Sequence, residues 1–131
     1  MARNHRGDPA KKRLKALGEE IKMAYIMITG YLSLLPEPIV LPPVDPRDSR
    51  PAIQALDRAR RFLIRNQRIP GRERQALAAA CLSWLNAFEM EHAAIVRDPD
   101  DHRLDNIEAA LARVVAAAEM VHPDSWRKPG Q

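Results

Sequence analysis

Cysteine, glycine and aromatic residues are scarce in this chain of 131 residues. It contains one Cys, five Gly and 5% aromatic residues. A single Cys excludes a disulfide framework within the chain and a zinc site built from several cysteines, and it is typical of a reducing compartment. Five glycines leave little room for a glycine-rich phosphate loop. The composition therefore excludes the disulfide-stapled class and disfavours the P-loop class.

Sequence signatures of catalysis are also missing, because no Gly-x-Ser-x-Gly, His-Glu-x-x-His or P-loop pattern is present. The acidic turn at 98–101 lacks the glycine and terminal Glu of an EF-hand loop, and helix capping explains its carboxylates. Two Glu-x-x-His pairs, Glu89/His92 and Glu119/His122, suggest the di-iron site of ferritin-like bundles. An antiparallel hairpin would separate them by about 18 Å. We therefore predict no enzyme, no metal and no cofactor.

Hydrophobic residues make up 46% of the chain and charged residues 29%, which indicates one globular domain over residues 1–131. A basic amino end followed by the apolar stretch 23–35 is similar to a signal peptide, but Glu19 and Glu20 interrupt it. The stretch is also shorter than the roughly 20 residues that span a bilayer. We therefore expect no membrane partner and a cytoplasmic location.

The first predicted helix starts at Asp8-Pro9, after a flexible amino end at residues 1–8, and stops at Pro36. One apolar seam repeats every seven residues along it, formed by Leu14, Ile21, Ile28 and Leu35. Its second half, 23–35, is apolar nearly all round. We therefore expect that half to be the most buried helical stretch of the molecule.

Residues 36–51 hold six of the 11 prolines, so they cannot form a helix and should run extended. A PxxP recognition motif is one interpretation of this segment. A structural crossover, which we call the strap, is favoured by its apolar residues Ile39, Val40, Leu41 and Val44.

Three further helices follow the strap. The second should run from a Ser49 cap to about Ile69, and the third should end before Pro99 with Leu77, Cys81, Trp84, Phe88 and Ile95 on one face. Cys81 is then a buried structural thiol. The fourth, capped by the acidic turn, has the seam Leu104, Ile107, Leu111, Val114, Ala118 and Val121, and a tail spans 123–131. The predicted fold is an all-α bundle of about four helices with a proline-rich crossover between the first and second.

The net charge of +4 is unevenly distributed along the chain. Residues 1–22 are net +4 and residues 50–74 net +6, whereas residues 23–49 are net −2 and residues 75–131 net −4. Sixteen of the basic residues are Arg and five are Lys. Arg suits phosphate because its planar fork donates two parallel hydrogen bonds, although a genomic bias toward Arg and Ala codons explains the ratio equally well.

The second helix carries an arginine stripe at spacings of three, four and three, formed by Arg58, Arg61, Arg65 and Arg68. It would point to solvent over about 15 Å, long enough to follow several phosphates. Phe62 offers a stacking surface for a base, and Arg72 and Arg74 continue the basic run. Within the helix only Asp57 can pair with Arg61. Phosphate contact, an acidic protein partner and a plain solvated face all remain open.

A second basic patch lies on the first helix, where Lys11, Lys15 and Lys22 share a face with Gly18. A glycine there would let another backbone approach closely. We expect Glu19 to neutralise Lys15 in part, at i, i+4. Four further basic residues would extend this patch toward the amino end, namely Arg3, Arg6, Lys12 and Arg13.

The favoured function is a non-catalytic subunit that contacts nucleic-acid backbone, either RNA or single-stranded DNA, inside a nucleoprotein assembly. In its helical seams and the run 58–68, RARRFLIRNQR, the chain resembles the small subunit of CRISPR–Cas effector complexes. That resemblance implies a short, basic, all-helical, non-enzymatic protein that lines up beside guide and target strands. Its protein partners would be other subunits, including copies of itself joined head-to-tail from basic to acidic regions.

Two alternatives stay open. One is a protein-interaction adaptor of the phage or plasmid type, whose basic face binds an acidic partner. The other is a helix-turn-helix regulator of DNA, with the motif at Arg65–Trp84 turning through Pro70-Gly71.

Overall fold

The computed structural model describes residues 7–45 and 47–126, and it is helical. Its elements are α1 Gly7–Ser33, α2 Arg50–Arg65, α3 Gly71–Val96, α4 Asp101–Glu119 and the short 3-10 helix η1 Pro123–Trp126. No strand occurs in those two ranges. The predicted all-α fold, with four helices and a crossover between the first two, is confirmed. Residues 1–6 of the predicted amino end and 127–131 of the tail lie outside the described ranges.

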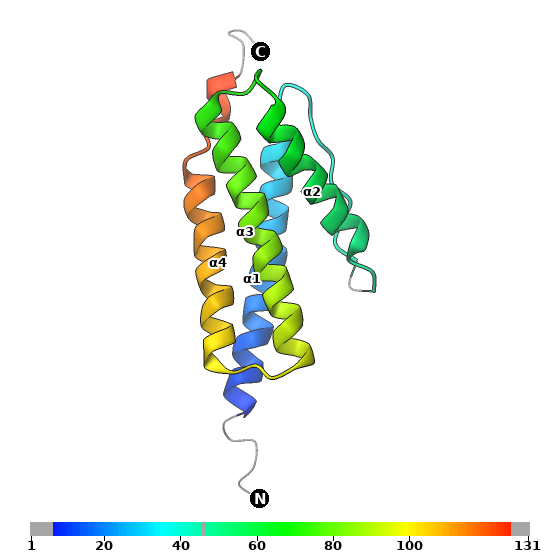
Figure 1. Cartoon of the computed structure of the whole chain (residues 1–131), viewed down its shortest axis with the longest axis vertical. Helices are drawn as coiled ribbons and strands as arrows, with labels where there is room; N and C mark the ends of the chain where they lie inside the picture. The colour runs from blue at the N-terminus through cyan, green and yellow to red at the C-terminus, as the bar shows by residue number, and fades with distance from the viewer. Residues whose placement is uncertain (1–6, 46, 127–131) are drawn as a thin grey trace, which may run out of the picture.

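Three long helices, α1, α3 and α4, run side by side, with α3 antiparallel to the other two (Figure 1). The strap leaves the end of α1, runs back along the bundle and turns into α2. α2 packs mainly against α3 and diverges from the bundle toward its own first turn (Figure 1). The end of α2 and the α3–α4 turn therefore lie at opposite ends of the molecule.

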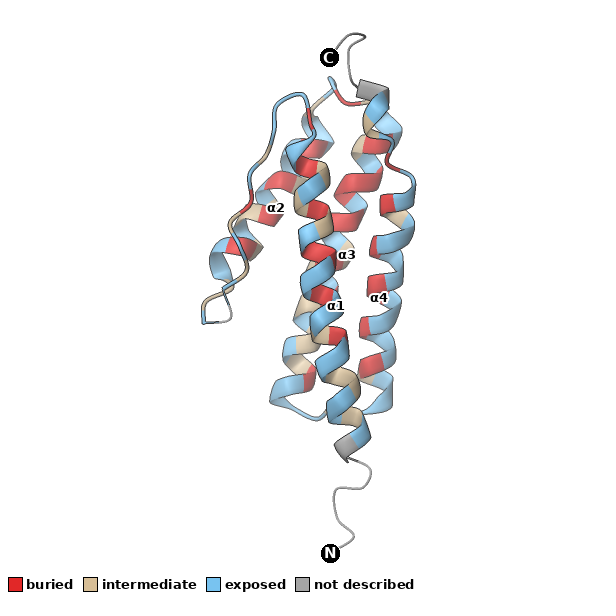
Figure 2. Cartoon of the chain, turned by 180° about the vertical axis from the view of Figure 1, so that it is seen from behind, coloured by how far each residue is buried: buried red, intermediate tan, exposed pale blue. Residues whose placement is uncertain are grey.

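The core forms where the predicted seams of the helices meet. Figure 2 shows the buried positions of α4 along the side that faces the bundle, and the whole predicted seam of that helix is buried. Trp84 on α3, only 1% exposed, donates its Nε1–H to the backbone oxygen of Ile21 at 2.8 Å. Its ring packs against Tyr25 and Phe88, with centroid distances of 5.1 and 5.3 Å. Cys81 is also buried, as predicted.

The helix ends follow the predicted signals with small shifts. Asp100 precedes α4, and its side chain accepts a hydrogen bond from the backbone nitrogen of Arg103 at 2.8 Å, so the predicted cap is confirmed. Ser49 occupies the cap position of α2, but its hydroxyl makes no capping bond. α1 begins at Gly7, one residue before the predicted Asp8 cap.

The strap packs on the bundle through part of its apolar side chains. Leu41 is buried, the backbone nitrogen of Ile39 donates to the oxygen of Leu32 at 3.1 Å, and the Tyr25 hydroxyl donates to the oxygen of Pro42. Val40, which we expected to pack as well, is 85% exposed. Successive side chains of an extended segment point to opposite sides, so Val40 points outward while Leu41 points inward.

Two burial predictions are wrong. The stretch 23–35 is not the most buried, because Met23 and Ile26 are 64% and 61% exposed. α1 packs against α3, α4 and the strap, and these neighbours leave Met23 and Ile26 largely in solvent. Ile95, expected on the buried face of α3, is 63% exposed. α2 stops short of the end of α3 at which Ile95 lies, so no helix covers that face there (Figure 1).

Candidate nucleic-acid interface

α2 separates apolar from basic side chains around its circumference. Its buried side is formed by Ala52, Leu56, Ala59 and Leu63. The opposite side carries Arg58, Arg61 and Arg65, all exposed, which we call the Arg face. The predicted orientation of these three arginines toward solvent is confirmed, because helical spacing of three and four keeps them on one side.

Arg68 does not belong to the helical stripe, contrary to prediction. α2 ends at Arg65, four residues before the predicted end, and Asn66 adopts an extended conformation with ψ of 102°. The Asn66 side-chain oxygen accepts a hydrogen bond from the backbone nitrogen of Arg68 at 3.0 Å, which favours a turn over another helical turn. The helical part of the stripe, Arg58 to Arg65, therefore spans about 10 Å.

The arginines of α2 differ in how far they are already paired. Asp57 accepts ion pairs from both Arg60 and Arg61, at 2.9 and 3.1 Å, so the predicted pairing of Arg61 is confirmed. Arg58 and Arg65 form no ion pair with any described residue. These two guanidinium groups can bind an external anion without first releasing an internal carboxylate.

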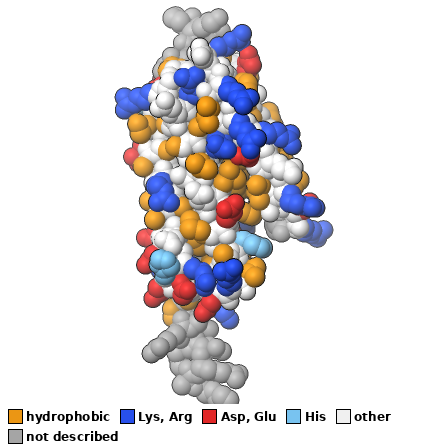
Figure 3. All heavy atoms as spheres, viewed as in Figure 1, with side chains coloured by type: hydrophobic (Ala, Val, Ile, Leu, Met, Phe, Trp, Pro, Cys, Tyr) orange, Lys and Arg blue, Asp and Glu red, His pale blue; other side chains and the backbone are white. Residues whose placement is uncertain are grey.

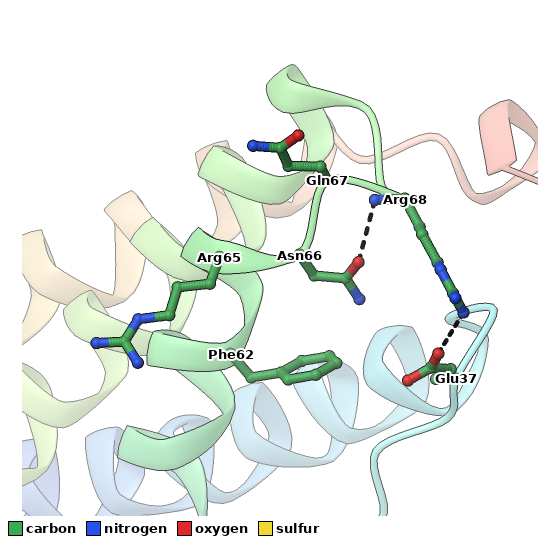
Figure 4. Close-up of a pocket in the computed structure, with 6 residues that line it drawn as sticks. All are labelled: Glu37, Phe62, Arg65, Asn66, Gln67 and Arg68. Carbon is green, nitrogen blue, oxygen red and sulfur yellow. Dashed lines mark hydrogen bonds and ion pairs between the residues drawn. The ribbon is translucent and has the colours of Figure 1, made fainter.

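Phe62 lies in a shallow pocket at the end of α2. The pocket has a volume of about 470 Å³ and is lined by Glu37, Phe62, Arg65, Asn66, Gln67 and Arg68 (Figure 4). The ring is 39% exposed, so one part packs and another faces solvent. Figure 4 shows Arg68 reaching across to an ion pair with Glu37 of the strap, whereas Arg65 points to the other side. A base lying on Phe62 would therefore have the unpaired Arg65 on one side and the Arg68–Glu37 ion pair on the other.

The basic run continues past the turn, as predicted, onto the first residues of α3. Arg72 is exposed and Arg74 is half-buried, and neither forms an ion pair with the described part of the chain. Figure 3 shows many Lys and Arg side chains toward this end of the molecule, whereas acidic and basic side chains are mixed toward the opposite end.

The lysine patch on α1 differs from its prediction in two contacts. Lys11 and Lys15 are exposed and unpaired among the described residues, whereas Glu19 pairs with Lys22 at 3.4 Å and not with Lys15. The close approach predicted at Gly18 is made by a side chain of this chain. A Cβ atom at Gly18 would lie 2.6 Å from the Oε2 atom of Glu91.

Arg13 does not extend the lysine patch either. Its guanidinium turns to α4 and pairs with Asp105 and Glu108 at 2.7 and 2.8 Å. Hydrogen bonds to Glu108 and Asp105 raise the pKa of Arg13, and they draw its side chain away from the lysines.

The structure keeps the two predicted basic surfaces apart. Lys11, Lys15 and Lys22 line a groove between α1 and α3, together with Arg47 of the strap. Phe62, Arg65 and Arg68 line the pocket at the far end of α2. The sequence analysis missed three residues of these surfaces, Glu37, Arg47 and Glu91, because a sequence does not show which side chains of other elements face a surface. The end of α2 at Asn66 could have been predicted, since Asn shortly before a Pro-Gly turn is a helix stop signal.

Comparison with known proteins finds no family model, curated protein or solved structure that matches this chain. Within residues 7–45 and 47–126, no three His, Cys, Asp or Glu side chains are grouped so that they could hold a metal ion. In the same ranges, no helix has the length and apolar character that a bilayer crossing requires.

Proposed function

We propose that this chain is a non-catalytic helical subunit that binds the backbone of RNA or single-stranded DNA within a nucleoprotein assembly. The small subunit of CRISPR–Cas effector complexes is the proposed instance, and the cytoplasm is the compartment in which such an assembly would meet nucleic acid. The observation that carries the proposal is the pair of exposed, unpaired guanidinium groups of Arg58 and Arg65 on one side of α2.

Three features support phosphate as the ligand of the Arg face. Unpaired guanidinium groups give up no internal ion pair when they bind an anion. Arg72 and Arg74 extend the positive surface around the turn, so a strand would meet cations over more than one helix. The half-exposed ring of Phe62 beside Arg65 adds a surface on which a base can stack.

The acidic turn between α3 and α4 supports assembly into rows. It presents the exposed carboxylates of Asp98 and Asp101 at the end opposite the Arg face. In a head-to-tail arrangement the acidic turn of one copy meets the Arg face of the next. Part of the basic surface would then be used by the neighbouring copy and part by the strand.

Binding of single-stranded RNA, single-stranded DNA and duplex DNA, followed by fluorescence anisotropy from about 50 to 200 mM salt, tests the proposal. We expect affinity for single strands to fall steeply with salt. The variant Arg58→Ala plus Arg65→Ala should lower the slope of log K against log salt by about 0.7 for each phosphate that the variant no longer binds.

The matched control is Arg97→Ala plus Arg113→Ala, which removes the same charge from exposed arginines outside α2 that form no ion pair with the described residues. It should leave the slope nearly unchanged. Absence of binding at the lowest salt, or an equal loss in both double variants, would refute a specific role for the Arg face. Sequence-specific duplex binding would favour the helix-turn-helix alternative.

The adaptor alternative has one observation in its favour. Met23 and Ile26 expose apolar side chains on the outer side of α1, where a protein partner could cover them. The regulator alternative has less support, because α3 packs against all three other helices and offers little free surface to a DNA groove.

A further inference from the structure

A groove of about 730 Å³ lies between α1 and α3, and Val44, Asp45, Arg47 and Ser49 of the strap line one side of it. This volume is in the range of sites for small molecules. Leu14 and Ile95 contribute apolar side chains to its walls, and Lys11, Lys15 and Arg47 contribute cations. It combines an apolar slot with a few charged groups, as ligand sites do.

Glu91 places a carboxylate inside this groove. The side chain is half-buried and lies over the Cα atom of Gly18, in space that a side chain at position 18 would fill. It accepts no hydrogen bond and forms no ion pair among the described residues. Burial raises the pKa of Glu91, and the nearby charges of Lys22 and His92 oppose that effect. A partly desolvated acceptor without a donor is stabilised when a ligand supplies an N–H group.

The free cations lie to one side of this carboxylate along the groove. Lys15 and Lys11 precede Gly18 on α1 by one and two turns, about 4.5 and 10 Å along the helix axis. Both are unpaired among the described residues, whereas Lys22, on the other side, is held by Glu19. Ile95 follows Glu91 by one turn of α3, toward the same end of the groove. Its exposed side chain offers an apolar surface against which a ligand can pack.

We propose that this groove binds a single nucleotide whose base carries an exocyclic amino group. The amino group donates to Glu91, the base packs against Leu14 and Ile95, and the phosphate lies on Lys11 and Lys15. Carboxylates recognise cytosine by accepting a hydrogen bond from its N4 amino group, so cytosine is the expected base. Adenine, which also carries an exocyclic amino group, is the second choice. The groove is separate from the Arg face, so its occupancy does not depend on the function proposed above.

Calorimetric or NMR titration of the full chain with CMP, AMP and UMP tests this assignment. CMP should bind about tenfold more tightly than UMP, because uracil has a carbonyl oxygen, which repels the carboxylate, where cytosine has its amino donor. Glu91→Gln should bring the CMP to UMP ratio close to one, since an amide both donates and accepts. Glu89→Gln makes the same charge change on α3 outside the groove lining and should preserve the ratio.

Two glycine variants on α1 test the geometry without removing a charge. Gly18→Ala puts a Cβ atom where the Glu91 carboxylate lies and should weaken CMP binding about tenfold by displacing it. Gly30→Ala, with no atom within 4 Å of the new Cβ, should bind CMP as the original chain does. Both substitutions favour helix formation, so a loss specific to Gly18→Ala is not a folding defect.

Equal affinity for CMP and UMP, absence of binding at millimolar nucleotide, or identical effects of Glu91→Gln and Glu89→Gln would each overturn the assignment. Arg58→Ala plus Arg65→Ala should weaken oligonucleotide binding and leave CMP binding unchanged, which separates this site from the Arg face. Comparing CMP with short cytidine and uridine strands identifies the source of the nucleotide. If Glu91→Gln removes a preference for the cytidine strand, the occupant is part of a strand, and if only CMP shows the preference, it is a free nucleotide.

Discussion

α4 and α2 are both amphipathic, but they are held in the molecule very differently. α4 packs against α1 and α3 and buries large side chains, namely Leu104, Ile107, Leu111 and Val114. α2 packs mainly against α3, and two of the four residues that it buries are alanines. Because burial free energy scales with apolar area, α2 is the less strongly anchored helix.

The difference matters because the Arg face lies on the weakly held helix. α2 diverges from the bundle toward its first turn, and the strap runs alongside α2 (Figure 1). Elements that bury less apolar area open at lower free energy than the rest of a domain. The molecule therefore joins a scaffold of three closely packed helices, α1, α3 and α4, to a basic helix that is less firmly held.

The largest expected effect tests the scaffold side of this comparison. Ile107→Ala removes a fully buried side chain of α4 and should lower the free energy of unfolding by about 2–5 kcal/mol. Ile64→Ala makes the same chemical change on α2 at a side chain that is mostly exposed, and it should cost less than about 0.5 kcal/mol. Urea denaturation of both variants measures the difference, and equal losses would contradict the assigned burial.

Cys81 on α3 offers a direct test of whether α2 opens alone. The thiol is buried, burial raises its pKa to about 12, and the charge of Arg60 on α2 acts on it. α2 therefore lies close to this thiol, which stays protonated and unreactive while covered. A thiol reagent should modify Cys81 at least about tenfold faster than exposure through global unfolding alone would allow. That factor corresponds to a local opening whose free energy is about 1.4 kcal/mol lower than the free energy of global unfolding.

Two variants distinguish local opening from global unfolding in the labelling experiment. Leu63→Ala weakens the buried side of α2 and should raise the labelling rate of Cys81. Ile107→Ala weakens α4 and should change that rate much less. If labelling tracks global unfolding and the two variants accelerate it equally, α2 is as firmly held as α4.

The difference between the two helices also explains how far the sequence could be interpreted. The seam of α4 was predicted residue by residue, because a helix packed along its whole length shows its buried side as strict three- and four-residue spacing. In the seam predicted for the first helix, Ile21, Ile28 and Leu35 are buried as predicted. The expectation that failed is the burial of the whole stretch 23–35, since a helix that is apolar nearly all round does not indicate which side a neighbour will cover. The predicted burial of Ile95 is wrong for a related reason, because the apolar seam of α3 extends beyond the part of α3 that a neighbouring helix covers.

The candidate site was predictable only within one helix. The spacing of Arg58, Arg61 and Arg65 and the Asp57–Arg61 pair are local, and helix geometry fixes them. Glu37 and Glu91 reach the basic surfaces from the strap and from α3, so their positions depend on tertiary packing. Long-range partners of this kind leave no periodic trace in a sequence.

A smaller effect is expected where the strap is attached. The Tyr25 hydroxyl donates to the backbone oxygen of Pro42, so Tyr25→Phe should cost about 1 kcal/mol and speed amide exchange in the strap and α2 more than in α4. Tyr31→Phe is the matched control, because the Tyr31 hydroxyl forms no hydrogen bond with the described residues. Uniform acceleration across all four helices would mean that the strap does not hold α2 in particular.

The smallest expected effect separates charge from geometry on the Arg face. Arg58→Lys plus Arg65→Lys keeps both positive charges, so the salt dependence of single-strand binding should be unchanged. The planar fork that binds phosphate through two parallel hydrogen bonds is lost, and the affinity of the double variant should fall by about threefold in all, in line with a net hydrogen-bond contribution of about 0.5–1 kcal/mol. The same exchange at Arg97 and Arg113, outside α2, should leave affinity as it was. An unchanged affinity for the α2 variant would mean that the arginines act only as charges, and the weakly anchored helix would then be an electrostatic surface without a defined phosphate geometry.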